Sequence, residues 1–372
     1  MHQTWLEISK SALLSNISEI RKNLSSDKKF IAVVKSNAYG HGLLEVASII
    51  QNKVDYLASY HFEDLLLLRK KRIKKQLLCL GRVFSNQIKL AIDNQIEITV
   101  STFDILQAAK RIRSKEKLKI HICIDSGLGR DGFLESDLPE VIELLKDKNF
   151  QKNVEVVGLY AHFASSDLIN FDYYTKSQIE ILQLWQESFS DIGLKPMVHA
   201  SASAATLRKK ALNFDAARVG LSIYGFWPSN DVKKQSSAKL KPVLSWRAKI
   251  VELKEMKAGS PISYNCTHVL KKDSKIAVLP IGYFDGIPRI SSGKSFVLIN
   301  GKKVPQIGRV TMNLIMIDVT EVKDVKQGDI VTIFGFDRKS QIKIDDWANW
   351  SQTSNYEISA RLNSFLSRKV VR

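Results

Sequence analysis

The chain reads Phe30-Ile31-Ala32-Val33-Val34-Lys35-Ser36-Asn37-Ala38-Tyr39-Gly40-His41-Gly42 over residues 30–42, an apolar run that ends directly in a lysine. Short β-branched runs of this kind recur eight times at intervals that suit one strand plus one helix. They are Phe30 to Val34, Tyr56 to Ser59, Leu77 to Leu80, Ile96 to Val100, Leu118 to Ile124, Val154 to Tyr160, Met197 to His199 and Arg218 to Tyr224. A segment between them, Ser177 to Phe189, has its apolar residues on one helical face. Strand and helix alternating eight times predicts a (β/α)₈ barrel.

The pattern changes after Trp227-Pro228-Ser229-Asn230. A polar stretch over residues 231–241 leads into period-two apolar runs separated by turn residues, and Asn300-Gly301 is a hairpin signal. The runs are Val243 to Val251, Lys275 to Leu279, Ser295 to Ile299, Leu314 to Val319 and Asp329 to Phe334. We therefore expect an α/β protein with an N-terminal (β/α)₈ barrel over residues 1–230 and a C-terminal all-β domain over residues 231–372.

Composition excludes several classes of protein. With 372 residues, 44% hydrophobic and 25% charged, the chain resembles a globular protein and not a disordered one. No apolar run approaches the ~20 residues of a membrane span, and the polar start does not resemble a signal peptide, so we expect a cytoplasmic protein. The cysteines Cys79, Cys123 and Cys266 are far apart, which argues against a disulfide framework and against structural zinc.

The charge of +18 raises the possibility of nucleic-acid binding, most of all at Arg69-Lys70-Lys71-Arg72-Ile73-Lys74-Lys75. That run follows an apolar helical stretch and has no stacking aromatics beside it, so a solvated helix end is the favoured interpretation. We expect no nucleic-acid partner and no membrane partner.

Lys35 stands at the end of the first strand, where the active sites of barrels lie. A lysine there can be desolvated, which lowers its pKa and makes the amine nucleophilic enough to form a Schiff base. The alternative is a lysine that only extends out of the barrel mouth.

Small and hydroxyl residues over 200–205 follow the seventh strand, and Arg218-Val219-Gly220-Leu221 begins the eighth. Loops at these positions commonly hold a phosphate in barrels, so the two features together suggest pyridoxal phosphate.

Four motifs of the chain occur in the order found in one known family. They are Ala32 to Gly42, Asp125-Ser126-Gly127-Leu128-Gly129-Arg130, Ser263-Tyr264 and Leu279 to Gly286. On these motifs the chain resembles the alanine racemases, amino-acid isomerases of the fold-type III pyridoxal-phosphate family, over nearly its whole length.

The resemblance implies a two-base mechanism in a homodimer with shared active sites. Lys35 would bind the cofactor and act as one acid/base, and Tyr264 from the partner subunit would act as the other. Two bases of different pKa would then face opposite sides of the α-carbon, as racemisation requires. Taken alone, Tyr264 is better interpreted as an ordinary strand tyrosine.

The resemblance also assigns binding residues. Arg218 would face the pyridine nitrogen, and His162 would link Arg218 to Tyr264; taken alone, each has a structural alternative, as a surface arginine and as a core histidine. The phosphate contacts implied are Tyr39, Ser203, Gly220, Leu221 and Tyr356. The substrate contacts implied are Arg130, the backbone N–H of Met312, and Tyr283 in the substrate channel.

The chain departs from the family pattern at three positions. Cys123 stands where many members carry a carbamylated lysine that positions the arginine equivalent to Arg130, so another anion, a bound chloride or packing must do this here. Asn313 replaces a common aspartate and Ala202 a common asparagine. These changes leave open whether alanine is strictly preferred.

The leading hypothesis is interconversion of L-alanine and D-alanine, which would supply D-alanine for peptidoglycan. The alternative is a broad-specificity, serine or lysine racemase with the same residues. A decarboxylase of the same fold type and a non-enzymatic cofactor carrier fit less well, because the pair Arg218 and Tyr264 and the C-terminal domain both favour racemisation.

Overall fold

The structure is a computed structural model that describes residues 3–208 and 212–372. The chain divides into two compact units, which we describe separately. The barrel unit contains Leu13–Ser36 and Val46–Lys241, and the β unit contains Met1–Ala12, Asn37–Glu45 and Pro242–Arg372.

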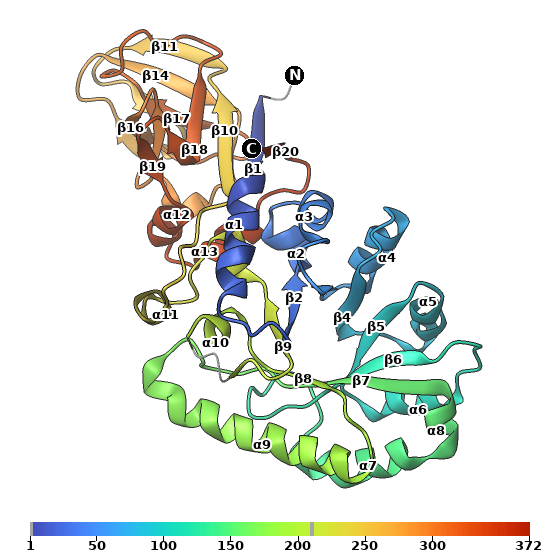
Figure 1. Cartoon of the computed structure of the whole chain (residues 1–372). Coiled ribbons are helices and arrows are strands. Elements are labelled where there is room, and N and C mark those ends of the chain that lie inside the picture. Colours follow the sequence, from blue (N-terminus) through green and yellow to red (C-terminus); the bar gives the residue numbers. More distant parts are fainter. Residues whose placement is uncertain (1–2, 209–211) are drawn as a thin grey trace. The chain divides into compact units, whose positions relative to one another are not determined.

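Eight parallel strands close the barrel of the barrel unit (Figure 1), which confirms the predicted fold. The strands are β2 (Lys29–Val33), β3 (Tyr56–Ser59), β4 (Gln76–Arg82), β5 (Ile96–Val100), β6 (Leu118–Cys123), β7 (Val154–Tyr160), β8 (Met197–His199) and β9 (Ala216–Val219). The helices that follow them include α3 (Leu43–Ile50), α4 (Phe62–Lys70), α5 (Ile88–Asp93), α6 (Phe103–Arg111), α7 (Leu138–Lys146), α8 (Lys148–Asn153), α9 (Asp172–Asp191) and α10 (Ser203–Arg208). The helix α1 (Lys10–Arg21) precedes β2, and α11 (Asn230–Gln235) follows β9.

The last barrel strand is shorter than the sequence predicts. It ends at Val219, and Leu221–Tyr224 form a 3₁₀ helix instead of continuing the expected run to Tyr224. Gly220 lies between them with φ −113° and ψ −80°, which is not a strand conformation. The expected strand over Leu221–Tyr224 was therefore wrong, because apolar periodicity alone does not separate a buried strand from a buried turn of helix.

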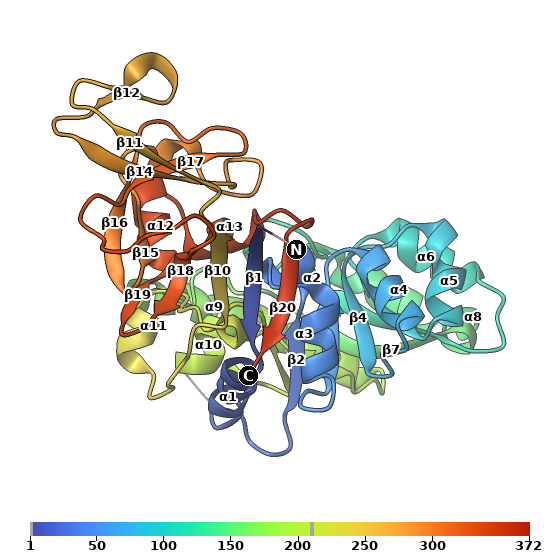
Figure 2. The ribbon, with the colours of Figure 1, turned by 90° about the horizontal axis from the view of Figure 1, so that it is seen from above.

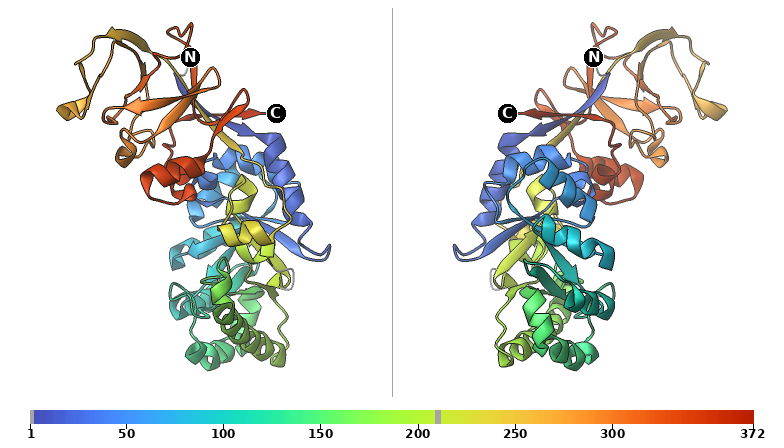
Figure 3. Two further views of the ribbon diagram at one scale, coloured as in Figure 1. Left: turned by 90° about the vertical axis from the view of Figure 1, so that its left-hand side faces the viewer. Right: turned by 90° about the vertical axis from the view of Figure 1, so that its right-hand side faces the viewer.

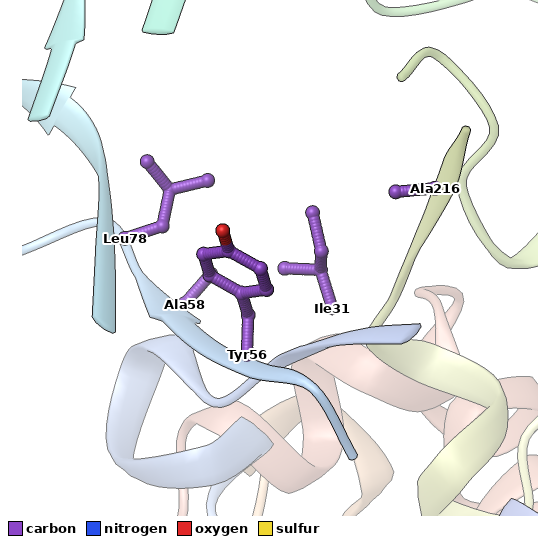
Figure 4. Close-up of a cluster of buried hydrophobic side chains, with 5 residues drawn as sticks. All are labelled: Ile31, Tyr56, Ala58, Leu78 and Ala216. Carbon is purple, nitrogen blue, oxygen red and sulfur yellow. The ribbon is translucent and has the colours of Figure 1, made fainter. Parts of the chain in front are cut away.

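Side chains fill the inside of the barrel, as this closed geometry requires. One buried cluster joins Ile31, Tyr56, Ala58, Leu78 and Ala216 from four strands (Figure 4). Outside the strands, the long helix α9, green in Figure 3, buries Leu182, Trp185 and Phe189, which confirms its predicted apolar face.

The β unit is built on a ten-stranded sheet. Its strand order is β11-β14-β17-β16-β15-β18-β10-β1-β20, with β19 paired to β18. The bounds are β1 (Thr4–Ser9), β10 (Leu244–Lys249), β11 (Glu252–Met256), β14 (Ser274–Leu279), β15 (Phe296–Ile299), β16 (Lys302–Ile307), β17 (Ile315–Asp318), β18 (Ile330–Asp337), β19 (Ser340–Ile342) and β20 (Ser367–Val371). The first strand β1 lies between β10 and β20 (Figure 2), so the sheet joins both ends of the chain.

Short elements complete the β unit. A separate pair, β12 (Pro261–Ile262) and β13 (His268–Val269), carries a loop, and α12 (Ile344–Ser351) and α13 (Asn355–Ala360) precede β20. The unit is thus mainly β, with two helices that period-two patterns did not predict. The predicted hairpin at Asn300-Gly301 joins β15 to β16 with positive φ at both residues, which confirms it.

The basic run begins in the last turn of α4 and continues beyond it, as expected for a helix end. The guanidinium of Arg69 donates to the carbonyl oxygens of Asn94 (2.8 Å), Ile73 (2.6 Å), Lys75 (2.7 Å) and Gln95 (2.9 Å). Arg69 therefore stabilises the turns around it. Within the described residues, no helix is long and apolar enough to span a membrane.

Candidate active site

Lys35 lies immediately after β2, at the carboxyl end of a barrel strand. Burial lowers the pKa of its amine, the positive charge of Arg130 lowers it further, and Asp131 acts in the opposite direction. Lys35 and Arg130 therefore share one region of the barrel mouth. A lysine whose pKa is depressed in this way has more of the neutral, nucleophilic amine at neutral pH.

The turn that begins at Lys35 is left-handed. In α2 (Lys35–Tyr39), Ser36, Asn37, Ala38 and Tyr39 all have φ between 53° and 55°. This conformation costs roughly 1–2 kcal/mol per non-glycine residue, and it persists only where the surroundings impose it. Strain of this size next to a buried amine indicates a site whose geometry is constrained.

The residues after that turn are held within the β unit. Gly40 has φ 82°, and a Cβ there would lie 1.8 Å from the carbonyl oxygen of Ser359, so only glycine fits. Arg368 donates to the Gly40 carbonyl at 3.0 Å. The same loop brings Tyr39 close to Tyr356 of α13: burial and the neighbouring phenol of Tyr356 raise the pKa of Tyr39 to about 12. The Tyr39 phenol therefore stays protonated and can donate.

Arg218 of β9 is buried and firmly held. One terminal nitrogen donates to His199 Nδ1 (2.6 Å) and to the His199 carbonyl (2.7 Å), and the other to the Ala161 carbonyl (2.7 Å). The guanidinium also lies over the Tyr160 ring, 4.7 Å from its centroid. Burial lowers the pKa of Arg218 to about 10, so it remains a cation at neutral pH.

His162 follows β7 beside Arg218. The second terminal nitrogen of Arg218 lies 3.2 Å from His162 Nδ1. Burial, followed by the charges of Arg218, Arg130 and Lys35, lowers the pKa of His162 to about 3, so the ring is neutral. Because an arginine can only donate, Nδ1 accepts and the proton of His162 lies on Nε2.

Asp125 organises the loop that carries Arg130. Its carboxylate accepts the backbone N–H groups of residues 127–130 at 2.8–3.1 Å. Burial alone would raise the pKa of Asp125, but these bonds lower it. The glycines of the motif allow the tight turn, since Gly127 has φ 120° and Gly129 φ 71°.

Asp131 is the anion that contacts Arg130. Its Oδ1 accepts from Arg130 Nε at 2.8 Å. Cys123 lies beside this pair, and its Sγ lies 3.7 Å from the Asp131 carbonyl oxygen. Burial raises the pKa of Cys123 to about 12, so the thiol supplies no negative charge. The sequence motifs left open which anion holds Arg130 and did not indicate Asp131, its neighbour in the chain.

The expected phosphate contacts of the barrel unit lie at two short helices. Ser203 begins α10, and its Oγ accepts the Ser222 N–H at 3.3 Å. Gly220 and Leu221 lie at the start of the 3₁₀ helix. A hydroxyl and the first N–H groups of a helical turn form a donor set suited to an anion.

Three of the expected site residues of the β unit, Tyr264, Tyr283 and Met312, lie on connected loops. Tyr264 begins a turn after β12, and the preceding Ser263 donates to the Arg309 carbonyl at 2.8 Å. Tyr283 N–H donates to the Thr311 carbonyl at 3.0 Å, next to Met312. All three side chains are exposed, Tyr264 by 68%.

Several residues that contact Arg218 directly or through others were given no role on the sequence alone. These are Glu97, Thr99, His121, Tyr160 and His199. The alternation of side chains along β6 could have indicated His121, because it places this residue on the same face of the strand as Cys123.

The fold and this cluster define a barrel enzyme whose partly buried lysine, fixed arginine and phosphate-type donors are arranged around one end of the barrel. The alanine racemase N-terminal domain family matches residues 8–228, and the alanine racemase C-terminal domain family matches residues 243–370. The chain belongs to the alanine racemase family.

Relatives and solved structures agree with this family. The alanine racemase of Methanococcus maripaludis is 37% identical over 372 residues, covering 99% of this chain and 98% of that protein. The alanine racemase of Clostridium perfringens is 38% identical, covering 98% and 94%. The structure of the Bacillus anthracis alanine racemase with bound L-Ala-P has a TM-score of 0.93 and 33% identity, covering all of this chain and 96% of that one.

Proposed function

We propose that this protein is a pyridoxal-phosphate-dependent alanine racemase that interconverts L-alanine and D-alanine in the cytoplasm and supplies D-alanine for peptidoglycan. The observation that carries the proposal is the cluster of Lys35, Arg130, His162 and Arg218 in the barrel of a member of this family. Their charges act on one another's pKa values, which supports a shared site for the four side chains.

The donor set fits pyridoxal phosphate. A lysine with a lowered pKa suits covalent attachment of an aldehyde, and a permanently cationic arginine suits a ring nitrogen that is to stay unprotonated. Ser203, Gly220 and Leu221 would hold the phosphate, joined by the phenols of Tyr39 and Tyr356. When bound, the cofactor supplies the electron sink that lets the α-C–H bond of an amino acid ionise.

The protein residues would then move the proton and hold the substrate. The Lys35 amine takes or returns the α-proton on one face, and the Tyr264 phenol does so on the other. Arg130 binds the substrate carboxylate through its charged fork, with the Met312 N–H beside it, and Tyr283 narrows the approach. Arg218 keeps the pyridine nitrogen unprotonated, which limits transfer of the amino group to the cofactor.

Tyr264 would act in the barrel of a second copy of the chain. It is exposed on its own unit, whereas a catalytic phenol works best where water is excluded. His162, whose Nε2 carries a proton directed away from Arg218, would contact that tyrosine. We therefore propose a homodimer with two shared sites.

The decisive experiment is chiral analysis of the amino acid after separate incubation of the loaded enzyme with L-alanine, L-serine and L-lysine. We expect D-alanine to form at the highest kcat/KM. Faster formation of D-serine or D-lysine would make serine or lysine the substrate in place of alanine. If none of the three amino acids is inverted, the proposed function is overturned.

A mixing experiment tests the shared sites. Lys35→Ala and Tyr264→Ala chains, each inactive alone, should together recover up to about a quarter of the wild-type activity after verified subunit exchange, because one in four sites is then intact. Absence of recovery after exchange would contradict a site built from two copies.

A further inference from the structure

A continuous line of buried polar side chains crosses the inside of the barrel. Arg218 contacts His199 Nδ1 at 2.6 Å, His199 Nε2 lies 2.9 Å from His121 Nδ1, and His121 Nε2 lies 2.8 Å from Glu97 Oε2. None of the four is more than 5% exposed. Barrel interiors are normally filled by apolar residues, and buried polar groups are costly unless they are paired.

The direction of every hydrogen bond in this line is fixed by its two ends. Arg218 can only donate, so His199 Nδ1 accepts and the His199 proton lies on Nε2. That proton is donated to His121 Nδ1, which places the His121 proton on Nε2, facing Glu97. A carboxylate oxygen of Glu97 accepts this hydrogen bond, so the line runs without conflict from the Arg218 donor to the Glu97 acceptor.

Neighbouring residues accommodate this line of polar side chains and pack against it. A Cβ at Gly158 would lie 1.9 Å from His121 Nδ1, so the glycine in the middle of β7 makes room for that ring. The Tyr160 ring stacks on His199 with centroids 4.8 Å apart and an interplanar angle of 11°. The Tyr56 hydroxyl hydrogen-bonds to Glu97, at the end of the line away from Arg218.

We propose that Glu97, His121 and His199 form a positioning relay, in which Glu97 holds both histidines in the tautomers that the Arg218 donor also requires and thereby holds the orientation of the Arg218 guanidinium. Without an acceptor at residue 97, His121 can place its proton on Nδ1, and His199 must then carry its proton on Nδ1, facing the N–H of Arg218. Two donors would meet there, and Arg218 would shift. The effect on catalysis rests on the proposed function, whereas the order of the tautomers does not.

The first test uses the wild-type, full-length protein with ¹⁵N-labelled histidine. We expect NMR at pH 7 to show His121 and His199 neutral and protonated on Nε2, with resonances assigned from their loss in His121→Gln and His199→Gln chains. A proton on Nδ1 of either ring, or a doubly protonated ring, would overturn the relay. This result does not depend on any variant at residue 97 being folded.

The second test changes the acceptor. Glu97→Met keeps a side chain of similar length but cannot accept, and Glu97→Gln keeps an accepting oxygen. We expect Glu97→Met to mix or reverse the tautomers and Glu97→Gln to retain them. As a matched control, Asp64→Asn changes another carboxylate to an amide, at a residue that accepts from Ser59 at 2.6 Å outside the relay. Unchanged tautomers in Glu97→Met would rule out a directing role for Glu97.

The third measurement links the relay to the reaction. With pyridoxal phosphate and L-alanine, transfer of the amino group to the cofactor releases pyruvate. We expect the ratio of pyruvate released to alanine racemised to rise about tenfold in Glu97→Met, corresponding to a buried charge-assisted hydrogen bond, and to stay near wild type in Glu97→Gln and Asp64→Asn. An unchanged ratio in Glu97→Met would show that the relay does not act through Arg218. If the wild type shows the expected tautomers and no racemisation, the proposed function fails and the relay stands.

Discussion

The two units present their candidate catalytic residues in opposite ways. In the barrel unit, Arg218 is 4% exposed and makes several short hydrogen bonds, and the pKa of Lys35 is lowered by its surroundings. In the β unit, Tyr264 is 68% exposed and Met312 54%. One half of the proposed site is therefore preorganised by the fold, and the other half lies on loops that must meet another surface to exclude water.

The largest effect should come from the preorganised half. Lys35→Ala removes both the attachment point of the cofactor and one proton-transfer group, so we expect kcat/KM for alanine to fall by at least about 10⁴-fold. The absorbance of the covalently attached cofactor and the borohydride-trapped adduct should disappear as well. Lys29→Ala, at the exposed start of the same strand, is the matched control and should keep both. An adduct that survives in Lys35→Ala would show that another residue attaches the cofactor.

Loss of the Tyr264 hydroxyl in the exposed half of the proposed site should slow the reaction of one enantiomer more than that of the other. Tyr264→Phe removes one hydroxyl, and we expect solvent-deuterium exchange at the α-carbon to fall by roughly 10²–10⁴-fold from one enantiomer and far less from the other. Tyr173→Phe changes another exposed tyrosine and should leave both rates unaltered. Equal losses from both enantiomers would refute the assignment of one base to each face.

Each unit also contains a histidine with a lowered pKa that should make it sensitive to acid. Burial lowers the pKa of His162 to about 3 and that of His41 in the β unit to about 4. Both folded pKa values lie below the unfolded value of ~6.5. Between these limits the unfolded chain binds more protons, so stability is complete above pH ~6.5 and is lost as the pH falls, by up to about 1.4 kcal/mol per pH unit for each histidine.

Urea midpoints at pH 7.5 and pH 5.0 measure this sensitivity. We expect a lower midpoint at pH 5.0, and a smaller difference between the two pH values in His162→Gln. His61→Gln, at an exposed histidine before α4, should behave as wild type. A difference that is unchanged in His162→Gln would mean that this ring is not held neutral.

Local patterns predicted most of the barrel, because each strand and helix is short and has its own periodicity. They also placed Lys35 at a strand end, since that position follows from the apolar run alone. They did not predict that β1 joins the sheet of the β unit, because its pairing with β10 links residues about 240 positions apart. The line from Glu97 to Arg218 was missed for the same reason, since four strands contribute one residue each.

Two aspartates hold Arg130 in different ways. Asp125 fixes the backbone of residues 127–130, and only Asp131 contacts the Arg130 guanidinium among the hydrogen bonds found in the described chain. Asp131→Ala should therefore leave the loop folded and raise KM for alanine by roughly three- to tenfold with a smaller change in kcat, because the pair is partly exposed. Asp104→Ala removes the partner of Arg82 from another exposed pair of 2.8 Å and should not change KM. An unchanged KM in Asp131→Ala would instead show that the backbone set by Asp125 is sufficient to position the arginine.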